Sequence, residues 1–332
     1  MNATINLENK HFPVLLNELV NIISPLYGGT FIDCTFGEGG YSKKILEDRK
    51  NKVIGIDRDK DVTFYANNLV KSFKNRFEFY NLKFSQIDRF KNSKPKAIIF
   101  DLGYSMNQIY DKQKGLSFKS IGKLNMKMGI NDFSAHDAIS KLSKEELNKI
   151  FKFFGDEKFS KKIANRIDLE RKKKEIKTED LKQIINIVKK NRNSKIDSST
   201  KVFQALRIFV NQEISELLNG LINAYNILPV GGLIAVVSFH SLEDKIVKFF
   251  FQSYSREESV SRYLPEAKKL DKYFKLIHKK PITPQKNEIN KNPPSRSAKL
   301  RYGFKIQEGC EFTELKKKFG YLTNIENLGL KL

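Results

Sequence analysis

The stretch FIDCTFGEGGYS, residues 31–42, combines residue types that suit the binding of a small charged molecule. Its apolar residues predict a strand that ends near Asp33, and a turn with Gly37, Gly39 and Gly40 precedes a helical pattern. Glycines let the backbone of such a turn approach a ligand closely and adopt left-handed conformations. The turn therefore predicts a ligand site at the end of a strand.

The glycine pattern does not match the two common phosphate-binding loops. A dinucleotide site has the pattern G-x-G-x-x-G, whereas Ser42 occupies the third position of that pattern here. The phosphate loop G-x-x-x-x-G-K-S/T is absent. The negative charges of Asp33 and Glu38 would repel a phosphate, but they would tolerate or favour a cofactor that carries an ammonium and a sulfonium group.

Two further acids end predicted strands and therefore belong to the same edge of a sheet. Asp57 ends the strand KVIGID, and Asp101 lies near the end of KAIIFDLG. Open α/β sheets bind ligands at this edge, where a carboxylate can accept both ribose hydroxyls of an adenosine. Taken singly, the turn could be only a tight turn, and Asp57 could be only a helix cap. Their joint spacing favours an adenosine cofactor with a positively charged tail, S-adenosylmethionine.

Five apolar segments predict the strands that position these residues. They are residues 30–37, 52–57, 76–82, 96–103 and 231–239. Near-continuous apolar strands that alternate with helices predict a parallel sheet covered on both faces. The segments YFKLIHKKPITP and SAKLRYGFKI supply two closing strands, and SLEDKIVKFFF predicts a helix with a capping box formed by Ser241 and Asp244.

The long gap before the fifth strand predicts an inserted domain, because a crossover needs only about a dozen residues. Residues 111–197 show helical periodicity and contain 23 Lys and Arg against 13 Asp and Glu. One long amphipathic helix is expected over residues 199–228. The predicted domains are a discontinuous sheet domain that holds the S-adenosylmethionine site (1–110 and 198–306), an inserted basic helical domain (111–197) and a C-terminal tail (307–332).

Composition restricts the compartment and the partner. The chain has 61 Lys and Arg against 38 Asp and Glu, and its net charge of +23 predicts a nucleic-acid partner, although a genome-wide bias toward Lys codons explains part of this charge. Cys34 and Cys310 are the only cysteines, which fits a reducing cytoplasm. The sequence shows neither a secretory signal nor an apolar run of membrane-spanning length, so a cytoplasmic protein is expected.

Several ordered blocks carry a more specific signal than the turn. They are HFPVLLNELV, IDCTFGEGGYS, IGIDRD, DLGYSMNQ, GLSF, FQALRIFVNQEISEL, VSFHSLEDKIVK and NPPSRSAKLR. Through them the chain resembles the bacterial 16S ribosomal RNA (cytosine-N4)-methyltransferases of the MraW type. The resemblance implies a Rossmann-like class I methyltransferase fold, with a mostly parallel seven-stranded sheet and an inserted all-helical domain. It also implies methyl transfer from S-adenosylmethionine to N4 of cytosine 1402, in the decoding region of the small ribosomal subunit.

The resemblance also implies a set of cofactor-binding residues. They are Gly39, Gly40, Tyr41, Asp57, Phe84, Asp101 and Gln108. The two glycines and Tyr41 would line the methionine and ribose part, Asp57 would hold the ribose, and Phe84 would lie against the adenine. Sequence alone fits Phe84 equally well as an ordinary core aromatic. The chain departs from the family pattern at Tyr41, where His is usual, and at Tyr104, Met106, Asn107 and Asn125.

The expected chemistry needs alignment and acceptors rather than a nucleophilic side chain. A cytosine amine is a poor nucleophile, so its N4 must be held in line with the methyl group while acceptors bind its hydrogens. Asp101 and the backbone carbonyls of Leu102, Gly103 and Tyr104 are the candidate acceptors, and Tyr104 is a candidate stacking face. No metal cluster and no reactive thiol is expected, since Cys34 lies in a buried strand.

Four residues are candidates for RNA contacts: Arg207, His240, Arg296 and Arg301. Residues 268–305 hold 12 basic residues and only two acids, and together with the inserted helices they would flank the cofactor edge. Basic helix faces are also explained by ordinary solvation. For His240, a contact to RNA and a packing role at a helix start fit the sequence equally well.

Other functions stay open on the sequence. A DNA amino-methyltransferase is disfavoured because the pattern [DNS]PP[YFW] is missing after the fourth strand, and NPPS at 292–295 lies in the wrong place. A non-catalytic RNA-binding or ribosome-assembly factor would keep the cofactor fold without methyl transfer. A dehydrogenase is disfavoured by the incomplete glycine pattern.

Overall fold

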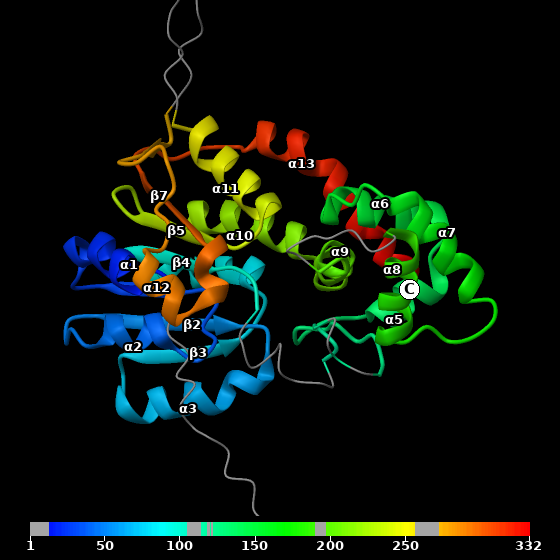
Figure 1. Ribbon diagram of the computed structural model, residues 1–332. Coiled ribbons are helices and arrows are strands. Elements are labelled where there is room, and N and C mark those ends of the chain that lie inside the picture. Colours follow the sequence, from blue (N-terminus) through cyan, green and yellow to red (C-terminus); the bar gives the residue numbers. More distant parts are fainter. Residues whose placement is uncertain (1–12, 105–113, 118–119, 121, 190–196, 256–271) are drawn as a thin grey trace, which may run out of the picture. The chain divides into compact units, whose positions relative to one another are not determined.

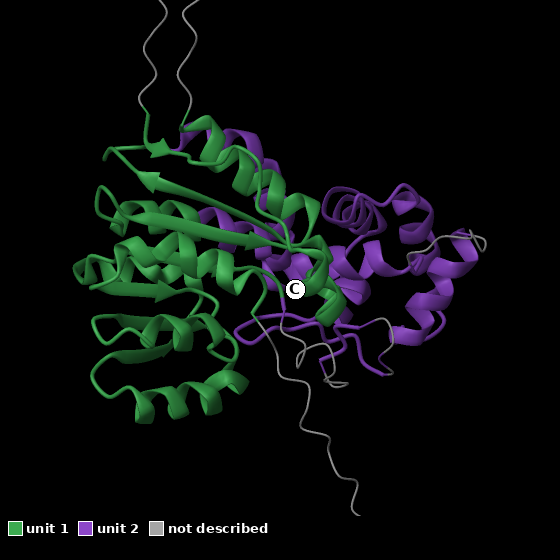
Figure 2. Ribbon diagram, turned by 60° about the vertical axis from the view of Figure 1, so that its left-hand side comes forward, with its two compact units in different colours: residues 1–103, 220–311 green, residues 104–219, 312–332 purple. Residues whose placement is uncertain are grey.

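The computed structural model describes residues 13–104, 114–117, 120, 122–189, 197–255 and 272–332. The chain divides into two compact units, drawn in different colours in Figure 2. The first unit comprises residues 1–103 and 220–311, and the second comprises residues 104–219 and 312–332. Each unit is built from two separate stretches of the chain.

The first unit contains a seven-stranded sheet with the order β3-β2-β1-β4-β5-β7-β6 (Figure 1). The strands are β1 (Thr30–Asp33), β2 (Lys52–Asp57), β3 (Phe77–Asn81), β4 (Ala97–Asp101), β5 (Leu233–Ser238), β6 (Phe274–Lys275) and β7 (Lys299–Lys305). The first five strands pair in parallel, while β7 pairs antiparallel with both β5 and β6. This mostly parallel sheet is the Rossmann-like class I methyltransferase fold, as the sequence predicts.

Helices connect these strands in the alternation that the sequence predicts. They are α1 (Leu16–Ile23), α2 (Gly40–Leu46), α3 (Thr63–Ser72), α11 (Ser241–Ser253) and α12 (Lys286–Lys291), with short 3₁₀ helices at Ser24–Leu26, Lys60–Val62, Phe84–Ser93 and Pro293–Ser297. The strands β1, β4 and β5 are buried along almost their whole length, because helices cover a parallel sheet on both faces.

The strand register brings the predicted acids to one edge of the sheet. Asp33 is opposite Gly55, Asp57 is opposite Asn81, and Asp101 is opposite Val237, each at the carboxyl end of its strand. Since parallel strands share this end, the three carboxyl groups belong to the edge where such sheets bind ligands.

The second unit is helical. Its helices are α5 (Ala135–Lys141), α6 (Lys144–Gly155), α7 (Ser160–Glu170), α8 (Thr178–Lys189), α9 (Thr200–Asn211), the first turns of α10 (Glu213–Ile227) and α13 (Thr313–Glu326), and a 3₁₀ helix follows at Asn327–Lys331. Capping boxes start α5 and α6, where Ser134 pairs with Asp137 and Ser143 pairs with Glu146. Helix α8 has Glu179 and Asp180 in its first turn and Lys189 in its last, as the helix dipole favours.

The helix predicted over residues 199–228 is in fact two helices. Gln212 adopts the left-handed conformation, with φ of 51°, and ends α9 directly before α10 begins. The amphipathic pattern continues across this break, so periodicity alone does not reveal it.

The compact units also differ from the predicted domains. The second unit includes all of α9 and the start of α10, which the sequence analysis assigned to the sheet domain. Residues 312–332, expected as a tail, fold as α13 and the 3₁₀ turn and belong to the second unit, where α13 packs against α6 and α9. In the described part of the chain, no helix is long and apolar enough to cross a membrane.

Candidate active site

Asp33 links the first strand to the glycine turn. Its Oδ2 accepts a hydrogen bond from Ser42 Oγ in α2 at 2.7 Å, and its Oδ1 accepts one from Thr35 N at 3.4 Å. The side chain is fully buried, and this burial raises its pKa to about 6 although Ser42 and Thr35 favour the ionised form. Ser42 stands where a dinucleotide site has its third glycine, and here its hydroxyl hydrogen bonds to Asp33.

Gly39 and Gly40 fit the turn because side chains there would collide with their neighbours. Gly39 has φ of 78° and is the N-cap of α2, and a Cβ on it would lie 2.7 Å from the Phe36 ring. A Cβ on Gly40 would lie 2.0 Å from Cγ of Pro13. Pro13 thus covers the turn directly.

Asp57 binds the same turn from the neighbouring strand. Its Oδ2 accepts a hydrogen bond from Gly37 N, and its Oδ1 accepts one from Asp59 N, both at 2.8 Å. Each carboxylate oxygen retains a second lone pair, so Asp57 can also accept the two hydroxyls of a ribose. Burial raises the pKa of Asp57 to about 6.

Asp101 has a carboxylate oxygen that is buried without a partner. Among the described residues, nothing hydrogen bonds to its Oδ1, while its backbone N–H donates to Thr35 Oγ1 at 2.6 Å. Burial, together with the nearby charges of Asp33 and Glu243, raises the pKa of Asp101 well above its usual value. An unpartnered buried acceptor is costly, so this atom is suited to a ligand that brings a donor or a positive charge.

Tyr41 lies next to this carboxyl group. It is buried, its hydroxyl donates to the carbonyl oxygen of Val14, and the hydroxyl also favours the ionised form of Asp101. Burial and the nearby acids raise the pKa of Tyr41 well above its usual value, so the phenol stays neutral. Tyr41 therefore connects the N-terminal residues to the edge of the sheet that carries Asp101.

Phe84 packs at the start of the 3₁₀ helix that follows β3. Its ring meets Phe100 edge to face at a centroid distance of 5.4 Å, and it is half-buried. A Cβ on Gly220 would lie 2.6 Å from the Phe84 ring. Phe84 is thus partly a core aromatic, and its exposed part leaves area for a planar ligand.

The segment after β4 is described only in part. Leu102 donates its backbone N–H to Val237 O at 2.9 Å, and Gly103 turns the chain with φ of 109°. Tyr104 is 45% exposed. Gln108, Met106 and Asn107 lie outside the described residues.

The model of the MraW methylase family matches residues 8–306 of this sequence. The chain belongs to the MraW methylase family. A curated relative, ribosomal RNA small subunit methyltransferase H of Bartonella henselae, is 40% identical over 309 residues, which cover 92% of this chain and 89% of that protein. The protein of the same name from Ehrlichia canis is 42% identical over 303 residues and covers 89% of this chain and 100% of its own.

Among solved structures, an rRNA methylase from Streptococcus thermophilus is 10% identical, covers 90% of this chain and 99% of its own, and has a TM-score of 0.41. This likeness is too remote to inform the chemistry of the site.

As a methylase of this family, the protein uses S-adenosylmethionine. The residues present fit this cofactor, because a buried edge with Asp33, Asp57 and the unpartnered Asp101 oxygen favours a ligand with a positive charge. Asp57 would hold the ribose, Asp101 would face the charged end, and the exposed part of Phe84 would lie against the adenine. A phosphate-bearing dinucleotide does not fit this acidic edge.

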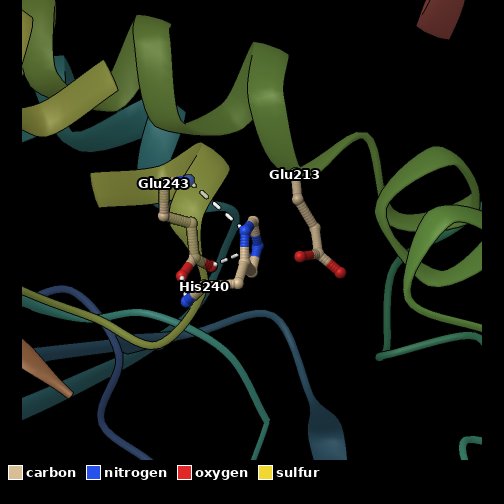
Figure 3. Close-up of side chains that lie close together, drawn as sticks. All are labelled: Glu213, His240 and Glu243. Atoms are coloured by element: carbon tan, nitrogen blue, oxygen red, sulfur yellow. Dashed lines mark hydrogen bonds and ion pairs between the residues drawn. The ribbon is translucent and has the colours of Figure 1, made fainter. Parts of the chain in front are cut away.

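His240 lies at the start of α11, where it forms a capping box with Glu243 (Figure 3). Its Nδ1 accepts a hydrogen bond from Glu243 N at 3.3 Å, and its Nε2 lies 3.1 Å from Glu243 Oε1. His240 thus caps the start of α11, which corresponds to the packing role that the sequence allowed beside an RNA contact. The capping box predicted for Ser241 and Asp244 is wrong by one residue, because the chain enters the helix at His240.

The arginines predicted to contact RNA differ in their surroundings. Arg301 Nε donates to Asp244 Oδ1 at 2.7 Å, and Lys299 Nζ binds the other oxygen of Asp244 at 2.9 Å. Arg207 is only 8% exposed and forms a bidentate pair with Glu213. Arg296 is exposed. Of the three, Arg296 has the surroundings expected of a phosphate contact.

Sequence reasoning missed several residues of the site. Thr35, Ser42 and Val14 all bind the acids or Tyr41 directly. The spacing of Ser42 after the glycines contained a signal, since a hydroxyl on the first turn of that helix faces the strand that ends at Asp33. Val14 acts through its backbone carbonyl, which no side-chain pattern can reveal.

Proposed function

We propose that this protein transfers the methyl group of S-adenosylmethionine to the exocyclic N4 of cytosine 1402 in 16S ribosomal RNA. Support for the RNA comes from the family and from the names of the two curated relatives. Support for an amine acceptor comes from the buried Asp101 oxygen at the carboxyl end of β4, which lacks a hydrogen-bond partner among the described residues. That single atom is the observation that carries the proposal.

Asp101 would act on the amine at the moment of transfer. The cytosine N4 carries two hydrogens, and an oxygen that accepts one of them orients the lone pair and stabilises the positive charge that develops on nitrogen. The bound cofactor would supply a methyl group on a sulfonium, and its sulfur would keep the electrons of the broken sulfur–carbon bond and leave as a neutral thioether. The lone pair of N4 forms the new bond to the methyl carbon. The methylated amine then gives one proton to water, so the reaction needs no covalent enzyme intermediate.

The charge of Asp101 changes with its surroundings. Burial holds its pKa high while the site lacks a positive charge. A sulfonium and a cationic amine both favour the carboxylate, so the acceptor becomes strongest when both are present. The carbonyls of Leu102, Gly103 and Tyr104 remain the further candidate acceptors.

RNA would be held by exposed cations of the first unit. They are Lys275 in β6 and, between β6 and β7, Lys279, Lys280, Lys286, Lys291 and Arg296. Lysine and arginine side chains on one segment bind phosphates without reading sequence, so the target base must be selected elsewhere. The base must also be unpaired or flipped out, since its amine is inaccessible in a stacked helix.

Replacing Asp101 with Asn tests the proposal directly. The substitution removes the charge but keeps the shape, so we expect methyl transfer to small ribosomal subunits to slow by about 100-fold or more. The readout is incorporation of labelled methyl groups at saturating cofactor. Asp88→Asn, an exposed acid on the 3₁₀ helix after β3, is the matched control. Full turnover by the Asp101 variant would contradict the assigned role.

A further inference from the structure

Arg207 is buried in α9 and fixed by a planar ion pair. Its Nε donates to Glu213 Oε1 and its Nη2 donates to Glu213 Oε2, both at 2.8 Å. Two parallel hydrogen bonds hold the guanidinium plane in one orientation, which a lysine ammonium cannot do. Since the carboxylate balances its charge and only 8% of Arg207 is exposed, this residue is a poor phosphate contact.

The same guanidinium lies against Tyr104. Its central carbon is 4.7 Å from the centre of the Tyr104 ring, a distance typical of a cation–π contact. Tyr104 is nevertheless 45% exposed. One face of the ring thus packs against Arg207, while another part of the ring is exposed and can contact a planar partner.

The helix start that carries Glu213 is held by the C-terminal segment. Glu326, at the end of α13, accepts hydrogen bonds from Ile214 N at 2.9 Å and Ser215 N at 2.7 Å, and also binds the Ser215 hydroxyl. These groups form the first turn of α10, directly after the left-handed break at Gln212. The backbone next to Glu213 is therefore tied to α13 by hydrogen bonds.

We propose that Arg207 is a positioning residue that holds the Tyr104 ring as a stacking surface for the target cytosine. This inference rests on the proposed function, because it assigns Tyr104 to the base whose amine is methylated. Stacking on an aromatic ring stabilises a bound base. A ring that is already fixed loses less conformational freedom when the base binds, so orientation by Arg207 improves both affinity and alignment.

A double-mutant cycle tests the inference. Tyr104→Phe keeps the ring and is expected to retain methyl transfer, whereas Tyr104→Ala lowers kcat/KM by about 10-fold or more. Arg207→Lys keeps the charge and loses the planar pair, and we expect a loss of several-fold. In the Tyr104→Ala background, Arg207→Lys should cost nothing further, because Arg207 acts through the ring.

Two further measurements separate positioning from folding. Cofactor affinity, measured by calorimetry, should be unchanged in all these variants, since none of the substituted residues is assigned to cofactor binding. Arg166→Lys is the matched control, because Arg166 pairs with Glu170 at 2.8 Å on the more exposed surface of α7. It should leave kcat/KM unchanged.

The outcomes distinguish the inference from the proposed function. Suppose that the wild-type protein methylates the RNA. An unchanged kcat/KM in Arg207→Lys, or losses that multiply in the double variant, would then overturn this inference and leave the proposed function intact. An absence of methylation by the wild-type protein would contradict the proposed function. The inference would then be tested by binding of a decoding-region oligoribonucleotide with cytidine or an abasic unit at the target: Tyr104→Ala and Arg207→Lys should each reduce the preference for cytidine, and an undiminished preference would refute it.

Discussion

Asp57 links the glycine turn to the second strand through hydrogen bonds. Its substitution is therefore expected to weaken cofactor binding. In the native protein the two carboxylate oxygens of Asp57 accept hydrogen bonds from Gly37 N and Asp59 N. Asp57→Asn keeps one acceptor oxygen, but its NH₂ group faces the other N–H, and two donors cannot hydrogen bond to each other. We expect the affinity for S-adenosylmethionine to fall by about 10- to 100-fold, because hydrogen bonds to charged groups contribute about 1.5–3 kcal/mol. Calorimetric titration measures the change, and Asp61→Asn, an exposed neighbour, is the control. Equal affinities for the two variants would refute the ribose role.

The acids of the site also predict a pH dependence. The pKa values of Asp33 and Asp57 are raised to about 6 in the cofactor-free protein, so both groups are ionised above that value and take up protons below it. A cofactor with a positively charged tail favours the ionised forms. Through these two groups the affinity should fall as pH drops through 6, by up to about 10-fold per unit for each coupled proton, and the raised pKa of Asp101 acts in the same direction. An affinity that rises toward pH 5 would contradict this account.

Single residues show what the sequence could and could not predict. Asp57 and Asp101 were predictable, because each ends an apolar strand and parallel strands end at a common edge. For His240 the sequence fitted two roles equally well. Its capping bond to Glu243 was not predictable, because the helix begins one residue earlier than the sequence pattern indicates. The ion pairs of Arg207 and Arg301 were not predictable, because each partner lies on a different helix or strand. From the sequence alone, an arginine in a strongly basic chain is easily assigned to nucleic-acid binding, because its acidic partner within the protein is not visible.

At the scale of elements, the C-terminal helix is the main departure from expectation. The family model ends at residue 306, yet α13 contributes Glu326 to the first turn of α10. Glu326 is fully buried, and burial raises its pKa to about 8. A carboxylate at a helix N-terminus satisfies backbone N–H groups that otherwise have no partner within the helix. Amphipathic periodicity predicts that such a helix has an apolar face, but not which helix end its last acid binds.

This buried carboxyl predicts how stability changes with pH. Because Glu326 titrates near 8 in the folded protein and near 4.5 when unfolded, the folded state binds more protons between these values. Its contribution to the free energy of unfolding therefore falls as pH rises from 4.5 to 8, by at most about 1.4 kcal/mol per unit. Urea unfolding should show this decline in the wild-type protein and a smaller one in Glu326→Gln. Glu314→Gln, an exposed acid on the same helix, should keep the wild-type slope.

At the scale of the whole molecule, the net charge of +23 sets the strength of RNA binding but not its target. Each phosphate contact made by an exposed cation should add about 0.7 to the slope of log affinity against log salt for a single-stranded RNA. We expect Arg296→Ala to reduce this slope, whereas Arg207→Lys should leave it unchanged, because Arg207 is paired within the protein. Filter binding over a range of salt concentrations measures both slopes. Equal reductions would show that burial and pairing do not separate the two arginines.

The most direct test of the account identifies the methylated nucleoside. Small ribosomal subunits that lack the modification are incubated with the protein and methyl-labelled S-adenosylmethionine, and the RNA is digested and analysed by mass spectrometry. The account predicts N4-methylcytidine at a single site in the decoding region, formed more slowly by about 100-fold or more with Asp101→Asn at comparable protein concentration. A methyl group on another atom or base, or cofactor binding without any methyl transfer, would contradict it.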